Sequence, residues 1–338
     1  MSITQSGDIR TGDVHVDSVL TNFAVKWGDP AFIADRVLPV IPVTKRSDKY
    51  HVWEFDSLRL PEADNRGEQD VAREIDFPLS TDTYFANDHA LGRFLADQVR
   101  ANADAGLAPA IQRAAMATQI KQMILRNWES EVATLLTTSG NYATDLYENL
   151  DSVANRNFDD SSGPGGIDII QQHIDEVELE SGGKVDTLWF ASDTWRLLKS
   201  DSTFIPSLSA TVVTTEEAIR DLFGVRQVLV ARSLQNSAAK GADDMSNARL
   251  WTSNTMGGTI ASPGATIDAP ATGATFVWNA FPGSVNGQTV TTYRDAENRG
   301  GGGEWIEFSQ YRDVKSTGVN SSDAFITAFL FDNVYDAI

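Results

Sequence analysis

The sequence predicts an α+β protein in which strand-rich segments flank one long helix and a separate unit alternates helices with strands. Three observations lead to this prediction. An apolar pattern with helical spacing runs from Ala110 to Thr138 without Gly or Pro. Runs of strand-forming residues lie on both sides of it. Helical and strand patterns then alternate over residues 166–290, which is typical of a compact α/β unit.

Composition sets the limits within which these elements fold. The chain has 338 residues, of which 41% are hydrophobic and eight are Trp, enough for one large domain or two to three small ones. The net charge is −20, and no cluster of Lys and Arg suits a nucleic acid. The absence of cysteine excludes disulfides and thiolate catalysis. Met1–Arg10 lacks the apolar core of a signal peptide, and no membrane span is expected, so we expect a protein working in a cytoplasm.

The first segment, residues 1–44, contains no clear helix or strand pattern. Pro30, Pro39 and Pro42 oppose a long helix and favour extended chain. An irregular opening of this length is unusual in a compact domain. We therefore expect an arm that lies on another surface.

Two strand-like runs follow, Lys49–Phe55 and Val71–Ser80, with the polar stretch Asp56–Asp70 between them. Together they predict a long β-hairpin with a wide charged tip. A two-stranded hairpin is marginally stable in water. It therefore needs a surface to lie on, in its own chain or in another.

The long helix is the clearest element, and Pro109 suits its first turn. A helix of about 28 residues would be about 42 Å long. Its apolar residues recur at spacings of three and four and are Ala117, Ile120, Ile124, Trp128, Val132 and Leu135. The charged residues of its flanks are Arg113, Lys121, Arg126, Glu129 and Glu131. We expect Ile124 and Trp128 to face a sheet.

The α/β unit begins after an acidic stretch. Between Asp145 and Asp186 there are 11 acidic and 2 basic residues, and the Gly-rich segment Asp159–Gly166 reads as a linker. Three helices are predicted after it. They are "IDIIQQHIDEVELES", which ends at Gly182, "DTWRLLKS", which is capped by Asp193, and "TTEEAIRDLFG", which has a Thr214–Glu217 capping box and ends at Gly224. The strands "TLWFAS" and "RQVLVA" lie between and after these helices.

The C-terminal part is again rich in strands. "TVTTYRD" and "WIEFSQYRDVKS" are expected to pair, and "AFITAFLFDNV" is apolar on both faces, as in a central strand. The glycine run Gly300–Gly303 is followed by Glu304 and not by Lys, which argues against a phosphate loop. It is either a slack loop or a crowded junction between copies. In the second case, valine at Gly301 and Gly302 should spare the fold of the single chain.

No residues form a recognisable catalytic, cofactor-binding or metal-binding pattern. The four histidines, His15, His51, His89 and His173, are far apart in the sequence, and no G-x-S-x-G motif is present. His173 stands beside Asp175 and Glu176, which is most typical of a solvated helix face. We therefore expect neither an enzyme nor a cofactor.

The chain resembles the major capsid proteins of tailed bacteriophages with the Hong Kong 97 fold. The stretches that carry the resemblance are "QVRANADAGLAPAIQRAAMATQIKQMILRNWESEVATLL", "VDTLWFASDTWRLLKSD", "LFGVRQVLVARSLQNSA" and "TTYRDAENRGGGGEWIEFSQYRDVKS", taken in this order. The resemblance covers nearly the whole chain and implies five regions. These are an N-terminal arm (1–44), an extended loop (45–84), a peripheral domain with a spine helix (85–165), an axial domain (166–293) and C-terminal strands returning to the peripheral domain (294–338).

The resemblance also implies a function. It predicts a structural protein of the virion whose hexamers and pentamers form an icosahedral head shell, assembled in the host cytoplasm and enclosing double-stranded DNA without sequence-specific binding. Scaffolding, portal and decoration proteins are the implied partners. Some relatives cross-link their subunits through a lysine of the extended loop, but no Lys lies between Lys49 and Lys121, so we expect no such bond.

Three other interpretations remain open on the sequence. The first is an encapsulin-like, non-viral compartment with the same fold. The second is another phage structural protein, of the tail or the baseplate. The third is an enzyme without a recognisable motif, which would remain a small oligomer and bind a substrate.

Overall fold

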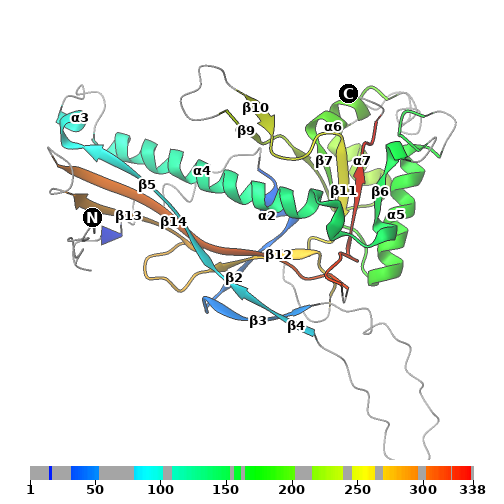
Figure 1. Cartoon of the computed structure of the whole chain (residues 1–338), viewed down its shortest axis with the longest axis horizontal. Coiled ribbons are helices and arrows are strands. Elements are labelled where there is room, and N and C mark those ends of the chain that lie inside the picture. Colours follow the sequence, from blue (N-terminus) through cyan, green and yellow to red (C-terminus); the bar gives the residue numbers. More distant parts are fainter. Residues whose placement is uncertain are drawn as a thin grey trace, which may run out of the picture.

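A computed structural model of the chain describes residues 15–16, 32–52, 80–101, 109–152, 156–160, 164–201, 215–238, 246–262, 269–295, 302–320 and 322–335. Two sheets lie towards opposite ends of the molecule, and the long helix α4 (Pro109–Thr137) runs along the first and reaches the second (Figure 1). None of the helices in the described ranges combines the length and apolar character needed to cross a membrane.

The first sheet has six strands and is organised around β14 (Gly303–Ser316), with the order β1-β13-β14-β12-β2 and with β5 also paired to β14. The other strands are β1 (His15–Val16), β2 (Val40–Val43), β5 (Asn87–Ala96), β12 (Gly273–Trp278) and β13 (Gln288–Asp295). β13 runs antiparallel to β14 from Gln288 opposite Gln310 to Asp295 opposite Gly303. The predicted pairing across the glycine run is therefore confirmed.

Helix α4 packs its N-terminal half on this six-stranded sheet. Ala117, Ile120 and Ile124 are buried against side chains of β13 and β14. Trp128 extends the contact to β12, where its indole N–H donates to Thr275 Oγ1 at 3.3 Å. The expected helix and the expected orientation of Ile124 and Trp128 are confirmed.

The C-terminal half of α4 packs on the second sheet instead. Trp128, Val132 and Leu136 belong to one buried cluster with Trp189 and Leu330 of that sheet. Helix α4 thus joins the two sheets through a single apolar stripe. The sequence analysis gave Leu135 as the last residue of this stripe. In the structure Leu136 is fully buried and Leu135 is partly exposed, so the prediction was wrong by one residue.

The second sheet has five strands in the order β6-β15-β11-β7-β8. These are β6 (Tyr147–Asn149), β7 (Thr187–Ala191), β8 (Gln227–Ala231), β11 (Thr255–Thr259) and β15 (Ala328–Asp332). One face is covered by α5 (Gly166–Ser181), α6 (Ser192–Leu198) and α7 (Glu216–Phe223), and the other by α4. Burial on both faces explains why β15 is apolar throughout, as predicted for a central strand.

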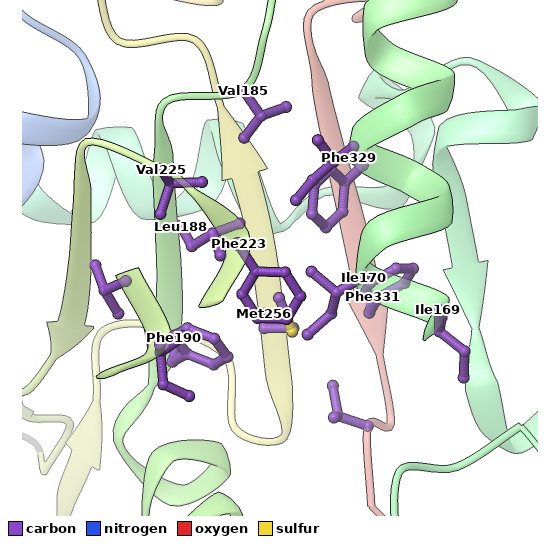
Figure 2. Packing of buried hydrophobic residues seen from close by; sticks show 14 of the residues in the cluster. Ile169, Ile170, Val185, Leu188, Phe190, Phe223, Val225, Met256, Phe329 and Phe331 are labelled. Carbon is purple, nitrogen blue, oxygen red and sulfur yellow. The ribbon is translucent and has the colours of Figure 1, made fainter. Parts of the chain in front are cut away.

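Figure 2 shows the packing on the α5 side, where Ile170 of α5 lies near Phe329 and Phe331 of β15. Met256 of β11 and Phe190 of β7 continue the same cluster along the sheet. Alternate residues of β15, Ala328 and Leu330, point to the opposite face, towards α4. The five-stranded sheet is thus the centre of the α/β unit.

The remaining elements are short. They are α2 (Ala34–Val37), α3 (Asp97–Ala101), the hairpin strands β3 (Ser47–Val52) and β4 (Ser80–Phe85), the hairpin strands β9 (Leu234–Asn236) and β10 (Asn247–Arg249), and the single 3-10 turns Ser139–Asn141, Thr144–Leu146 and Leu150–Ser152. In residues 1–44 no clear element was expected. The structure nevertheless places α2 and β2 there, with β2 parallel to β12.

Sheet membership also departs from the expected division at residue 293. β12 precedes that boundary and β13 spans it, yet both belong to the six-stranded sheet, whereas β15 follows it but lies inside the five-stranded sheet. The reason is that strand partners are chosen by contacts distant in sequence, which a local pattern does not reveal. The chain therefore crosses between the two sheets more often than expected.

Two helix starts differ in detail from the sequence prediction. Helix α7 begins after Thr215, whose hydroxyl oxygen accepts a hydrogen bond from the Ala218 N–H at 3.2 Å, while Thr214 lies outside the described residues. Helix α6 follows Ala191, and Asp193 lies in its first turn without capping it. The two helix ends were predicted correctly, since Gly182 (φ 69°) and Gly224 (φ 61°) adopt the left-handed conformation.

Three polar side chains on helices are buried, although the sequence pattern suggested solvated faces. Lys121 and Glu129 lie within the buried stripe of α4, and burial lowers the pKa of Lys121 to about 8. His173 is 3% exposed and packs edge-on against Phe331 at 4.5 Å between ring centroids. Burial lowers the pKa of the His173 imidazole.

The packing of α4 predicts a sharp contrast between two neighbouring residues. Ile124 is 1% exposed and Met123 is 56% exposed, so only the first side chain contributes to the core. We expect Ile124→Ala to lower the free energy of unfolding by about 2–5 kcal/mol, measured by urea denaturation. Met123→Ala introduces alanine into the same helix at an exposed position, so it should change the free energy of unfolding by no more than about 0.5 kcal/mol. Equal losses would show that the buried face is assigned wrongly.

Candidate functional site

In the part of the chain that the structure describes, no group of three or more His, Asp or Glu side chains could hold a metal ion. His51 lies on β3, His89 on β5 and His173 on α5, so these three histidines are not brought together. His15 is in β1, and its side chain lies outside the described part. The features that stand out are instead the points where projecting segments are fixed to the two sheets.

The first such point is the base of the hairpin β3–β4. The two strands pair antiparallel from Ser47 opposite Phe85 to Val52 opposite Ser80. The expected partner strand, Val71–Ser80, lies outside the described residues except for Ser80, so the described pairing involves a segment that follows it. The hairpin tip, Asp56–Asp70, also lies outside the described residues.

Two tyrosines hold this base on the six-stranded sheet. The rings of Tyr84 and Tyr50 lie 4.6 Å and 5.1 Å from the ring of Phe276 on β12. The Tyr50 hydroxyl lies 2.8 Å from Asp82 Oδ2 and 3.1 Å from the Ser316 carbonyl oxygen, both of which accept hydrogen bonds. Burial raises the pKa of Tyr50, so it stays a donor. The hairpin therefore leaves the sheet at a fixed position.

The second point is a buried carboxylate in the middle of α4. Glu129 is fully buried, and its oxygens accept hydrogen bonds from the backbone N–H groups of Ile33 (3.0 Å) and Ala34 (2.9 Å), at the start of α2. They also accept from Trp251 Nε1 (2.6 Å) and Ser233 Oγ (3.4 Å), on the two sides of the β9–β10 hairpin. One side chain thus fixes both the N-terminal segment and this hairpin to the spine helix.

The hydrogen bonds of Glu129 oppose the effect of its burial. Burial raises the pKa of the Glu129 carboxyl, while the hydrogen bonds from Trp251, Ala34, Ile33 and Ser233 act in the opposite direction. The indole and the two backbone groups can only donate, so each needs an acceptor lone pair on the carboxyl, whereas the Ser233 hydroxyl can donate or accept. An ionised carboxylate can accept from all four partners. In the sequence, the only indication that Glu129 fixes other segments was its position, as an acidic residue next to Trp128 in the apolar stripe of the helix.

The third point is the far end of the six-stranded sheet, where the glycine run ends. Gly302 has φ 68°, and its carbonyl oxygen accepts a hydrogen bond from the Asp97 N–H at 3.1 Å. A Cβ at Gly303 would lie 2.4 Å from the Phe94 ring and 2.5 Å from the Leu95 carbonyl oxygen, both on β5. Gly300 and Gly301 lie outside the described residues.

These contacts correct the expectation for the glycines. Valine at Gly302 should not spare the fold of the single chain, because a β-branched residue is strained at positive φ. At Gly303 the crowding comes from β5 of the same chain. Gly302 and Gly303 are therefore constrained already within one subunit.

Charged residues surround the same end of the sheet. Arg113 pairs with Glu304 at 2.6 Å, and Asp97 pairs with Arg100 at 3.0 Å and with Arg294 at 2.9 Å. A small cavity of about 200 Å³ lies among these side chains. These ion pairs link α4 to β14 and α3 to β13 at this end of the six-stranded sheet.

A larger groove of about 630 Å³ lies between the C-terminal half of α4 and the strands β5 and β14. Its floor holds Arg312, which is fully buried and pairs with Glu131 at 2.9 Å. His89 Nδ1 lies 3.8 Å from the same carboxylate. The remaining wall includes Thr134, Asn141, Leu135 and Val314, so polar and apolar side chains both line the groove.

We expect Glu129→Gln to destabilise the protein by about 2–4 kcal/mol, because the amide NH₂ faces donors that then lose their acceptor. The loss should appear as a lower midpoint in urea denaturation.

The control is Glu178→Gln, since Glu178 is exposed on α5, and it should change stability by less than about 0.5 kcal/mol. A Glu129→Gln variant as stable as this control would contradict the role of the carboxylate.

The glycine contacts give a second prediction for this region. Gly303→Ala should cost about 1–3 kcal/mol, because the new methyl group overlaps the Phe94 ring and the β5 backbone. Gly140→Ala provides the control, since no atom lies within 4 Å of a Cβ built there. Thermal unfolding of the two variants tests the difference. A Gly303→Ala variant with wild-type stability would show that β5 yields easily.

Comparison with known proteins gives matches in structure but not in sequence. No family model matches the chain, and no curated protein matches its sequence. A phage-related protein from Bordetella bronchiseptica RB50 matches with a TM-score of 0.70 and 17% identity, covering 96% of this chain and 99% of that one.

Two capsid proteins are also similar in structure. The putative capsid protein of a prophage of E. coli CFT073 has a TM-score of 0.53 and 10% identity, with 94% of this chain and 99% of that one covered. The capsid of the cyanophage P-SCSP1u gives 0.53 and 10%, with 88% and 86% covered. The chain therefore has the fold of tailed-phage capsid proteins of the Hong Kong 97 type, as the sequence predicted.

Proposed function

We propose that this chain is a major capsid protein that assembles with copies of itself into an icosahedral phage head. The observation that carries the proposal is the fold, which is shared with phage capsid proteins over nearly the full length of both chains. In this role the chain forms hexamers and pentamers, acts as a structural protein of the virion and catalyses no reaction.

Two of the fixed points described above support this role. A subunit that contacts many neighbours needs projecting segments whose starting positions do not vary. The tyrosine contacts on Phe276 supply one such position, and the Glu129 hydrogen bonds supply another. The regions implied by the resemblance, an arm in residues 1–44 and an extended loop in residues 45–84, would begin at these two points.

The charge of the chain is compatible with a shell that encloses DNA without binding it tightly. A net charge of −20 gives no basis for tight binding of DNA, which suits a shell that must pack and release its genome. The proposed partners are copies of this chain first, then scaffolding, portal and decoration proteins. Assembly in the cytoplasm of the host follows from the same proposal.

Electron microscopy of the purified protein tests the proposal. We expect closed shells, alone or on addition of the scaffolding protein, and we expect that nuclease-protected DNA is found in particles taken from infected or induced cells.

Other outcomes would identify the alternatives. Closed shells that hold protein cargo and no DNA would indicate an encapsulin-like compartment, and tubes or open rings would indicate a tail or baseplate protein. A small oligomer under all conditions would contradict a shell-forming role.

A further inference from the structure

The two edges of the five-stranded sheet differ in charge. At the β6 edge lie the 3-10 turns, β6 and α5, and the described residues from Asp145 to Glu180 include ten acidic residues and one basic residue, Arg156. At the β8 edge lie α6, α7, β8 and the β9–β10 hairpin, whose described residues from Ser192 to Arg249 include six basic and five acidic residues. We name these the acidic edge and the mixed edge.

The two edges face away from each other. β6 and β8 are the outermost strands of the sheet, with three strands between them. Figure 1 shows α5 and the β9–β10 hairpin on opposite sides of the five-stranded sheet. A contact between these two surfaces within one chain is excluded by this arrangement, so each is free to meet another molecule.

Each edge also exposes large apolar side chains among its charges. On α5, Leu179 is 78% exposed and is flanked by the exposed acidic residues Asp175 and Glu178. At the mixed edge, Leu222 of α7 is 36% exposed. The more exposed apolar residue of this edge is Leu234 of β9, at 49%. It pairs across the hairpin with Arg249, whose guanidinium donates to the Arg232 carbonyl oxygen at 3.3 Å. A guanidinium has five N–H donors, so this single hydrogen bond leaves others for a partner.

The base of the β9–β10 hairpin is fixed by Ser233 and Trp251, both hydrogen-bonded to the buried carboxylate of Glu129. Leu234 and Arg249 lie next to this base, and residues held in place lose less conformational freedom on binding than unfixed ones. This part of the mixed edge is therefore suited to a specific contact.

We propose that the acidic edge of one copy binds the mixed edge of a second copy, with Leu179 and Leu234 at the centre of the contact and Arg249 facing Asp175 and Glu178. This inference rests on the proposed function, and the contact is the one that would join neighbouring subunits within each hexamer or pentamer. Because the two surfaces differ, the contact is head-to-tail and generates a ring when the rotation closes.

Charge selects this arrangement over a symmetric one. If two acidic edges met each other, the carboxylates of both α5 helices would face one another, and like charges at an interface cost free energy. A head-to-tail contact places the acidic edge against a surface with a small excess of basic residues. The chain as a whole is strongly acidic, so this is the pairing with the least repulsion.

Charge reversal tests the proposal. The first variant carries Asp175→Lys and Glu178→Lys, the second carries Arg232→Glu and Arg249→Glu, and the third combines all four changes. We expect the first and second to lower the yield of rings and shells by about tenfold, measured by sedimentation velocity and electron microscopy. The third should recover most of the wild-type yield, because each contact regains opposite charges.

Matched controls separate the contact from effects of net charge and of folding. Asn127→Lys adds a positive charge on the exposed side of α4, outside both edges, and should assemble as the wild type does. Leu179→Ser and Leu234→Ser should each reduce assembly, whereas Met123→Ser, which truncates an exposed residue of α4, should not. These single truncations keep the test decisive if a charge-reversed chain fails to fold.

Three results would overturn the inference. Wild-type assembly of the first and second variants would show that the edges do not meet. A folded combined variant with no recovery would indicate a symmetric contact or another surface. Leu179→Ser and Leu234→Ser chains that assemble like Met123→Ser would exclude the apolar centre. If the wild-type chain itself formed no closed particles, the proposed function would fail and this contact with it.

Discussion

The packing of α4 against both sheets is the interaction on which the rest of the structure depends. Its first half is buried on β13 and β14, and its second half is buried on the face of the five-stranded sheet opposite α5. Because an isolated helix gains little stability from its own hydrogen bonds, this double burial is what stabilises a helix of 29 residues in its position. Because the apolar side of α4 packs on both sheets, this helix fixes the position of one sheet relative to the other.

Glu129 extends that dependence from the core to the surface. Its position on α4 is set by the apolar residues around it, and its oxygens in turn set the start of α2 and the base of the β9–β10 hairpin. A buried carboxylate is costly unless its partners are complete, and here they are supplied by segments about 95 and 122 positions away in the chain. Hydrogen bonding to Glu129, together with the burial of Ile33 and Trp251 beside α4, therefore determines where these segments leave the body.

Much of the fold could be predicted from local sequence patterns. The helical period gave α4, the left-handed glycines gave the ends of α5 and α7, and apolar runs gave β7, β8 and β15. The candidate site could not be predicted in the same way. Glu129 and His173 are polar residues in helical patterns, and a pattern assigns such residues to solvent unless their distant partners are known.

Sheet membership failed for a related reason. Which strands pair depends on contacts between segments far apart in the chain, and β12 and β15 each joined the sheet on the other side of the expected boundary. Local alternation indicates that a strand exists and which face is buried, but it carries no information about the partner. The parts that escaped prediction are thus those fixed by long-range contacts.

The placement of β15 has a consequence for the order of folding. This strand lies between β6 and β11 and supplies Phe329 and Phe331 to the core. Its pairing with β6 brings together residues as far apart in the chain as Tyr147 and Asp332, which are separated by 185 positions. Contacts of such separation form slowly, because the entropy of closing the intervening loop opposes them. Among the described strands β6 pairs with β15 alone, so β6 is held in the sheet only once this distant strand has docked.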